Sequence, residues 1–133
     1  LDGVPMNQRI ELPVIEETQM GMSIGLSLMG YVPVSIYPRM DFLLLAMNQL
    51  VNHLDKIALM SQGGYRPKVI IRTKVGSKIP LDAGPQHTQD YTEALRSMLT
   101  TIRVVRLTDM SQAIAVYRDA LKSDASSLVV EVW

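Results

Sequence analysis

Short apolar stretches recur along the chain and are separated by longer amphipathic ones. Residues 31–37, YVPVSIY, are apolar almost throughout, and residues 68–74, KVIIRTK, contain three consecutive apolar side chains, at residues 69–71. Such runs are typical of strands that are covered on both faces, whereas strict alternation marks strands with one wet face. The pattern predicts five strands, at residues 9–15, 31–37, 68–74, 102–107 and 128–132.

Helical periodicity fills the intervals between these predicted strands. It is clearest in residues 42–61, where Leu43, Met47, Leu50 and Leu54 recur every three or four positions between polar side chains. Asp41 precedes this segment as a candidate N-cap, and paired glycines follow it. The pattern predicts four helices, at residues 17–29, 42–61, 91–99 and 111–122.

Strands that alternate with helices through the whole chain predict an α/β fold. We expect a three-layer, doubly wound parallel sheet with helices on both faces, built as one domain over residues 1–133. A chain of 133 residues is long enough to bury a hydrophobic core without disulfides or a structural metal.

Composition narrows the classes of function. Thirteen basic and thirteen acidic residues give a formal net charge of zero, which argues against nucleic-acid or anionic-membrane partners. There is no cysteine, and there are only two histidines, so we predict neither a thiol nucleophile nor a metal site. No apolar run of 18 residues and no signal-peptide pattern is present, and we predict a cytoplasmic location.

Two further features bear on the organisation of the chain. It begins at Leu1 rather than at a methionine, so we expect a processed protein or an excised portion of a longer one. It also contains nine methionines, whose flexible side chains fill cores or interfaces, and core filling is the favoured reading.

Candidate chemistry gathers where the predicted strands end. Glu16 follows the first predicted strand, Phe42 follows the second, and the loop of residues 75–89, which carries His87, follows the third. Ligands of parallel sheets bind beyond the carboxyl ends of the strands, so these side chains should converge on one edge. Each also has a structural explanation, as a helix-start carboxylate, a core aromatic and a loop histidine, respectively.

Gly21 and Gly25 lie one turn apart in the first predicted helix. A glycine inside a helix costs about 1 kcal/mol relative to alanine, so something should approach that face closely. Packing against the sheet is the expected reason, and a ligand is the alternative.

Four segments together resemble a known family. They read PVIEETQMGMSIGLSLMGYVPV, DFLLLAMNQLVNHLDKIALMSQGG, VIIRT and GPQHTQ, and the resemblance covers about residues 10–132. They are similar to the pyrimidine-binding (transketolase central) domain of thiamine diphosphate-dependent enzymes. The β subunits of 2-oxo acid dehydrogenases match most closely, and transketolases match more distantly.

The resemblance implies a role for each candidate residue. Glu16 matches the glutamate that hydrogen-bonds N1′ of the aminopyrimidine and so activates the cofactor, while Phe42 matches an aromatic ring that packs on the pyrimidine. His87 matches a histidine on the substrate side of the pocket. The implied cofactor is thiamine diphosphate, with Mg²⁺ and the diphosphate held by a partner α subunit or domain in a homo- or hetero-oligomer.

Departures from the family pattern leave alternatives open. Glu17 adds a second carboxylate beside Glu16 and is the fallback assignment, while Lys74 and Lys78 could bind an anionic substrate or be solvated. The chain should lack the family domain's first strand and helix, the following C-terminal domain and the diphosphate motif. We therefore expect it to be inactive alone and to self-associate. The alternative function is a non-catalytic interaction or regulatory module, and a generic small-molecule binder is a weaker one.

Overall fold

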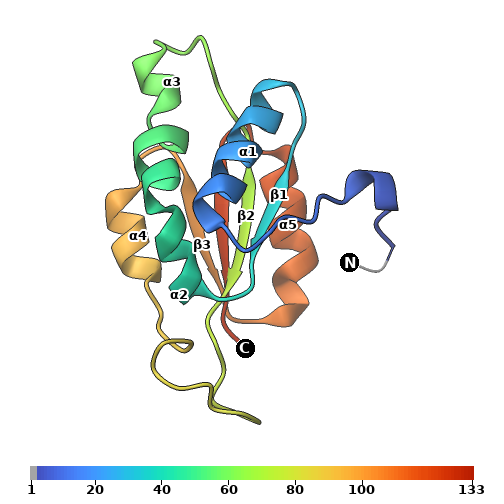
Figure 1. The fold of residues 1–133 in the computed structure, drawn as a ribbon, viewed down its shortest axis with the longest axis vertical. Helices are drawn as coiled ribbons and strands as arrows, with labels where there is room; N and C mark the ends of the chain where they lie inside the picture. The colour runs from blue at the N-terminus through green and yellow to red at the C-terminus, as the bar shows by residue number, and fades with distance from the viewer. Residues whose placement is uncertain (1–2) are drawn as a thin grey trace.

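The computed structural model describes residues 3–133, which form one parallel sheet flanked by helices (Figure 1). Every neighbouring pair of strands runs parallel, and the strand order is β1-β2-β4-β3. The predicted α/β class is confirmed. The strands are β1 (Val34–Tyr37), β2 (Ile70–Lys74), β3 (Arg103–Leu107) and β4 (Ser127–Glu131).

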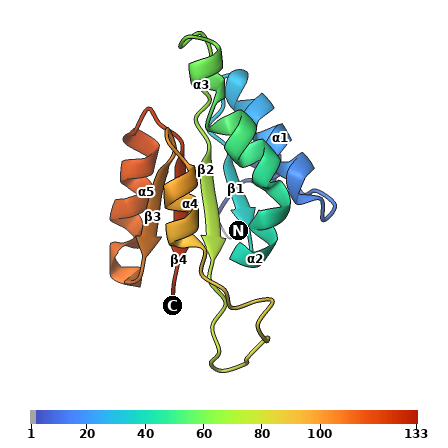
Figure 2. The same cartoon turned by 90° about the vertical axis from the view of Figure 1, so that its left-hand side faces the viewer.

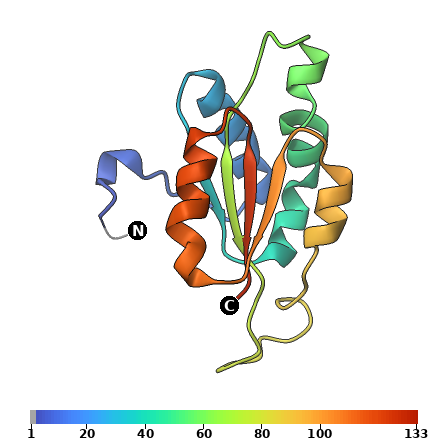
Figure 3. The same cartoon turned by 180° about the vertical axis from the view of Figure 1, so that it is seen from behind.

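Helices cover both faces of the sheet, but unequally. Figure 2 shows α5 (Ala113–Lys122) on one side and α1 (Glu16–Leu28) on the other, and Figure 3 shows α5 alone in front of the strands. The α1 face also carries α2 (Met40–Leu43) and α4 (Thr92–Met98). Short helical turns complete the chain: η1 (Met6–Gln8), η2 (Leu44–Ala46), η3 (Asn48–Leu54), α3 (Ile57–Met60) and η4 (Met110–Gln112).

The main core lies between the sheet and the α1 face. Met20 from α1, Leu43 from α2 and Leu128 from β4 are fully buried there and belong to one contiguous cluster. Only two methionines, Met20 and Met40, are fully buried, so the expectation that the methionines mainly fill the core is wrong. Six of the nine are exposed: Met6, Met22, Met29, Met60, Met98 and Met110.

The predicted strand at residues 9–15 does not form. This segment has no sheet partner in the structure, and Ile10, Val14 and Ile15 are exposed. Pro13 explains part of the failure, because proline has no backbone N–H to donate to a neighbouring strand. The described sheet therefore has four strands rather than five.

The long predicted helix at residues 42–61 is broken into several turns. It begins at Met40, so Asp41 lies in the first turn and is not the N-cap. The turn of η3 is widened, and the backbone N–H of Asp55 donates to the carbonyl of Leu50, five residues back, at 3.0 Å. Apolar periodicity predicts which face of such a segment is buried. A widened turn leaves the buried face almost unchanged, so the periodicity does not reveal where the helix is interrupted.

Glycines end the helical segments as expected. Gly30 has φ +91° after α1, and Tyr31 N–H donates to the carbonyl of Leu26 at 3.2 Å, which closes the last turn. Gly63 has φ +84° after α3, and its N–H reaches the carbonyl of Ala58 at 2.7 Å. Both positions need the left-handed backbone that glycine adopts without strain.

Candidate functional site

Glu16 is the first residue of α1 and lies at the carboxyl edge of the sheet. Its backbone carbonyl accepts a hydrogen bond from the hydroxyl of Tyr37, the last residue of β1, at 3.3 Å. Burial raises the pKa of the Tyr37 phenol to about 12, and the negative charge of Glu16 acts in the same direction. The predicted edge is therefore correct for Glu16, although no strand precedes it. The start of α1 reaches the edge because α1 runs back along β1.

Two sets of hydrogen bonds fix α1 on the sheet. The side-chain amide of Gln19 donates to the hydroxyl of Ser35 at 3.1 Å and to the carbonyl of Ile36 at 2.9 Å. Near the other end of α1, the hydroxyl of Ser27 donates to the carbonyl of Lys68 at 3.0 Å. These contacts hold the first turn, and with it Glu16, in a defined place relative to β1.

The two adjacent carboxylates have different surroundings. Glu17 accepts a hydrogen bond from the side chain of Asn48 at 3.1 Å, and Asn48 in turn accepts from Asn52 at 3.0 Å. The half-buried side chain of Glu16 makes no hydrogen bond to any other residue in the 3–133 range. Glu17 therefore links α1 to η3, while the carboxylate of Glu16 is left uncommitted.

The structure brings Phe42 and His87 into contact. Their ring centroids are 5.3 Å apart and the ring planes meet at 78°, which is an edge-to-face arrangement. The side chain of Phe42 is 38% exposed. The structural explanation of Phe42 as a buried core aromatic is therefore wrong. The Nδ1 atom of His87 is buried and has no hydrogen-bond partner within the described chain.

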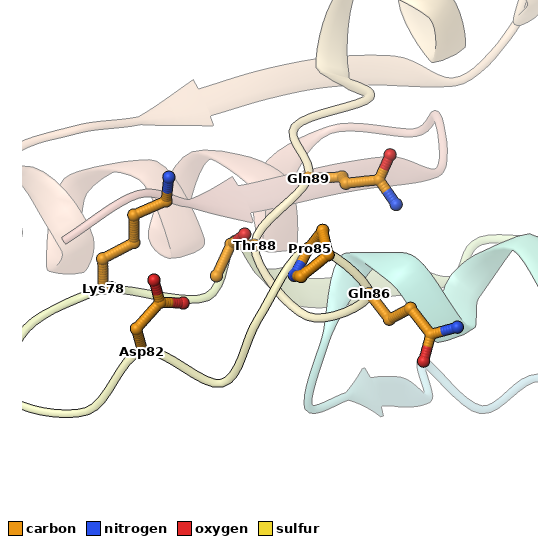
Figure 4. Close-up of a pocket in the computed structure, with 6 residues that line it drawn as sticks. All are labelled: Lys78, Asp82, Pro85, Gln86, Thr88 and Gln89. Atoms are coloured by element: carbon orange, nitrogen blue, oxygen red, sulfur yellow. The ribbon is translucent and has the colours of Figure 1, made fainter.

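The long loop that carries His87 extends beyond the carboxyl ends of the strands (Figure 1). The loop leaves the sheet through a first limb, which contains Gly76, and returns through a second limb, residues 85–91. The two limbs touch at Gly76, where an added Cβ would lie only 1.7 Å from the carbonyl oxygen of His87. A glycine is therefore required at this crossing. One hollow of about 310 Å³ lies between the limbs and is lined by Lys78, Asp82, Pro85, Gln86, Thr88 and Gln89 (Figure 4).

A second hollow, of about 390 Å³, lies beside the first part of the loop. Arg39 and Lys74 line it together with apolar side chains such as Leu81 and Trp133. Lys74 and Lys78 therefore face different hollows, and neither forms a salt bridge with a described residue. The same holds for Arg39.

Gly21 and Gly25 do not pack on the sheet as expected. A Cβ at Gly21 would meet the side chain of Gln49 at an ordinary 3.7 Å, and one at Gly25 would meet nothing within 4 Å. Close packing against the sheet therefore does not explain either glycine within this chain.

Two features are absent from residues 3–133. No group of three or more histidine, aspartate or glutamate side chains is arranged to hold a metal ion in that range. None of its helices combines the length and the apolar character needed to cross a bilayer.

Comparison with known proteins identifies the relatives of the chain. No protein-family model matches it. The pyruvate dehydrogenase E1 component subunit β of Gracilaria tenuistipitata var. liui is 27% identical over 115 residues, which is 86% of this chain and 35% of that protein. The chloroplastic subunit β-3 of Arabidopsis thaliana is 28% identical over 122 residues, or 92% of this chain and 29% of that protein. The resemblance to 2-oxo acid dehydrogenase β subunits is confirmed.

The E1 β subunits are much longer than this chain. A third relative, from Chaetosphaeridium globosum, is 31% identical over 80 residues, which is 60% of this chain and 24% of that protein. The chain thus spans about a third or less of the length of the relatives it matches. The Arabidopsis relative has a chloroplastic name and one from Ascaris suum a mitochondrial name, so these two lend no support to a cytoplasmic location, which stays a prediction.

Sequence reasoning missed three residues that shape the site. Gly76 fixes the crossing of the loop limbs, and Asp41 accepts a hydrogen bond from Gln89 at 3.3 Å. The glycine in the loop was a visible signal for a close backbone approach. The contact between Asp41 and Gln89 joins residues 48 positions apart, and no local pattern marks it.

Proposed function

We propose that this chain is the pyrimidine-binding part of a thiamine diphosphate-dependent enzyme of the 2-oxo acid dehydrogenase β-subunit type. The observation that carries the proposal is the gathering of Glu16, Phe42 and His87 toward the carboxyl edge, in a chain related to E1 β subunits. Ligands of parallel sheets bind at this edge.

The surroundings of Glu16 suit the role that the family resemblance implies. Its carboxylate is half-buried and uncommitted, so it is free to share a proton with N1′ of an aminopyrimidine. Glu17 is the poorer candidate because Asn48 already occupies one of its oxygens. Thiamine diphosphate, when bound, supplies the carbanion chemistry, and Glu16 holds the proton that activates it.

Phe42 and His87 suit the two neighbouring roles. The exposed part of the Phe42 ring offers an apolar surface for the pyrimidine, an interaction worth about 0.5–1.5 kcal/mol beyond area burial. His87 packs on the edge of the same contact and can hold or move a proton at the substrate. The residues present therefore fit the aminopyrimidine end of the cofactor.

A partner chain or domain completes this site in our proposal. The 133 residues contain no Gly-Asp-Gly motif for Mg²⁺ and diphosphate. We propose a hetero-oligomer with a diphosphate-binding α subunit, in which this chain is inactive alone.

The alternative is a non-catalytic interaction module with the same fold. Its support is the exposure of large apolar side chains such as Ile79 and Leu81, at 82% and 76%. Exposed apolar side chains favour contact with another protein, but they do not account for an uncommitted carboxylate at the ligand edge.

Reconstitution tests the two functions against each other. The chain is co-expressed with an E1 α subunit, supplied with thiamine diphosphate and Mg²⁺, and assayed for CO₂ release from pyruvate and from longer 2-oxo acids. We expect turnover in the complex and none from either component alone. A complex that forms but neither binds thiamine diphosphate nor releases CO₂ contradicts the catalytic proposal and favours the module.

Matched variants assign the carboxylate. Glu16→Gln should lower the rate by about 10²–10⁴-fold, the usual contribution of a group that transfers a proton. Glu17→Gln keeps a side chain that can accept from Asn48 and should stay within a few-fold of the original rate. If both variants are as fast as the unmodified chain, neither carboxylate is the activating group.

A further inference from the structure

The second limb of the long loop lies along α2. The backbone N–H of Tyr91 donates to the sulfur of Met40 at 3.3 Å, and the ring of His87 packs on the edge of Phe42. These contacts join two residues of the loop, Tyr91 and His87, to Met40 and Phe42 of one helical turn. They indicate that α2 is the surface on which the His87 limb rests.

Asp41 makes a third contact, which lies between the Met40–Tyr91 and Phe42–His87 contacts. Its Oδ1 atom accepts a hydrogen bond from the side-chain amide of Gln89 at 3.3 Å. Residues 40, 41 and 42 thus meet residues 91, 89 and 87 in order, running in opposite directions. Gln89 is the only one of these loop residues that is held by a charged group.

Neither helix capping nor ion pairing accounts for a carboxylate at position 41. Arg39 is the N-cap of α2, and no side chain makes a capping hydrogen bond there. Asp41 forms no salt bridge with a described residue. Its Oδ2 atom is nevertheless buried without a partner among residues 3–133, which is a costly state for a carboxylate oxygen.

The second limb also contacts the first limb of the loop. The backbone of Gly76 lies against the carbonyl of His87, which fixes where the main chain of His87 passes. That contact does not set the direction of the imidazole, because it involves only backbone atoms. A side-chain contact two residues later, from Gln89 to Asp41, ties the limb to α2 and so restricts rotation of the segment that carries the imidazole.

We propose that Asp41 is a positioning residue for His87, which it acts on through Gln89. By holding Gln89, Asp41 keeps the limb turned so that the imidazole of His87 faces the ring of Phe42. This inference rests on the proposed function only for the role of His87 in catalysis. The contacts themselves belong to the chain alone.

The composition of the chain provides a direct probe. Phe42 is the only phenylalanine, so replacement by 4-fluorophenylalanine gives a single ¹⁹F NMR signal from the ring that touches His87. The resonance of the His87→Ala variant defines the position of that signal without the imidazole. Amide hydrogen exchange over residues 85–91 reports separately on the order of the limb.

Asp41→Ala and Gln89→Leu should each move the ¹⁹F signal toward the His87→Ala position. Each should also speed amide exchange in the limb by about threefold to tenfold, the equivalent of one hydrogen bond. The double variant should add little, because both changes remove the same contact. Asp41→Asn keeps an acceptor oxygen and should leave the signal near its original place.

Gln86→Leu is the matched control, since it removes the amide on the other side of His87, and Gln86 has no side-chain hydrogen bond to α2. An unmoved signal in Asp41→Ala overturns the proposal, as does a Gln86→Leu variant that moves the signal equally far. Additive effects in the double variant would also contradict it.

The reconstituted complex adds a functional readout. Asp41→Ala should lower kcat several-fold with KM little changed, and Asp41→Asn should restore most of the rate. Full activity in Asp41→Ala despite a shifted ¹⁹F signal would overturn the positioning role. If the unmodified complex shows no turnover at all, the proposed function fails, but the ¹⁹F and exchange measurements still decide whether Asp41 orients His87.

Discussion

Two aspartates at opposite edges of the sheet have opposite surroundings. Asp55 lies at the amino edge, fully buried, and its carboxylate accepts from the backbone N–H groups of Thr100, Thr101 and Ile102 at 2.7–3.2 Å. Lys56 completes its partners with an ion pair at 2.6 Å. Asp41, at the carboxyl edge, has one partner at 3.3 Å and one buried oxygen with none in the described chain.

The same contrast holds for other polar groups. Four buried side-chain atoms of the described residues lack a hydrogen-bond partner, and three of them lie toward the carboxyl edge, in Asp41, Thr73 and His87. The fourth, in Ser127, lies at the start of β4. Since buried polar groups are nearly always satisfied where only stability is at stake, this concentration of unpaired groups supports the ligand site that we propose at the carboxyl edge.

Removing Asp55 should have the largest effect on stability. Asp55→Ala leaves three backbone N–H groups without their acceptor, that of buried Ile102 among them, and breaks the ion pair with Lys56, so it should lower the free energy of unfolding by about 3 kcal/mol. Urea unfolding at neutral pH measures this loss. Asp119→Ala, which breaks the exposed pair with Arg103, is the control and should cost less than about 1 kcal/mol.

Gly76→Ala should disturb the carboxyl edge while sparing the amino edge. The added Cβ would clash with the carbonyl of His87, so the loop limbs must separate and the contact with Phe42 should be lost. We expect the ¹⁹F signal of Phe42 to reach the His87→Ala position, with a stability loss of about 1–3 kcal/mol at most. An unchanged ¹⁹F signal would show that the crossing at Gly76 does not position His87.

Acid should weaken the amino edge. Burial disfavours the ionised form of Asp55, but hydrogen bonds from Lys56 and from Thr101 and Thr100 outweigh burial and hold its pKa well below the ordinary value of 3.8. A carboxyl with a lowered folded pKa stabilises the protein above the ordinary value, and this stabilisation disappears as the pH falls below it. Unfolding free energies measured from pH 6 to pH 2 should fall less steeply for Asp55→Asn than for the unmodified chain.

Gly25→Ala should have the smallest effect, and it should be stabilising. A Cβ at Gly25 meets no atom of this chain within 4 Å, and alanine in a helix is favoured over glycine by up to about 1 kcal/mol. Thermal unfolding of the isolated chain measures the gain. Destabilisation would mean that the face of α1 at Gly25 is covered, for example by the self-association that the sequence predicts.

The sequence predicts the layers of the fold well because apolar periodicity reports directly on burial. Residues 69–71 are continuously apolar and fall at the start of β2, the strand beside β1 and β4 in the sheet interior. Residues 9–15 are also apolar in part, but Pro13 and the lack of a neighbour keep them out of the sheet. Whether a segment pairs as a strand depends on the neighbouring strands of the whole sheet, so a local sequence pattern does not predict it.

The candidate site could be predicted only as far as strand ends and family motifs allow. Both locate Glu16, Phe42 and His87, and the structure gathers them toward one edge. The family motif favours Glu16 over Glu17, but neither strand ends nor motifs predict the hydrogen bond by which Asn48 in η3 binds Glu17. The grip of Asp41 on Gln89 depends on the path of a long loop, which side-chain periodicity does not encode.

The most direct test of the account is the rate of the reconstituted complex carrying Glu16→Gln. Thiamine diphosphate binding and assembly are measured first, so that a loss of rate is not a loss of the complex. We predict assembly like that of the unmodified chain and a rate of CO₂ release lower by about 10²–10⁴-fold, with Glu17→Gln close to normal. A fully assembled Glu16→Gln complex that works at the original rate would contradict the account.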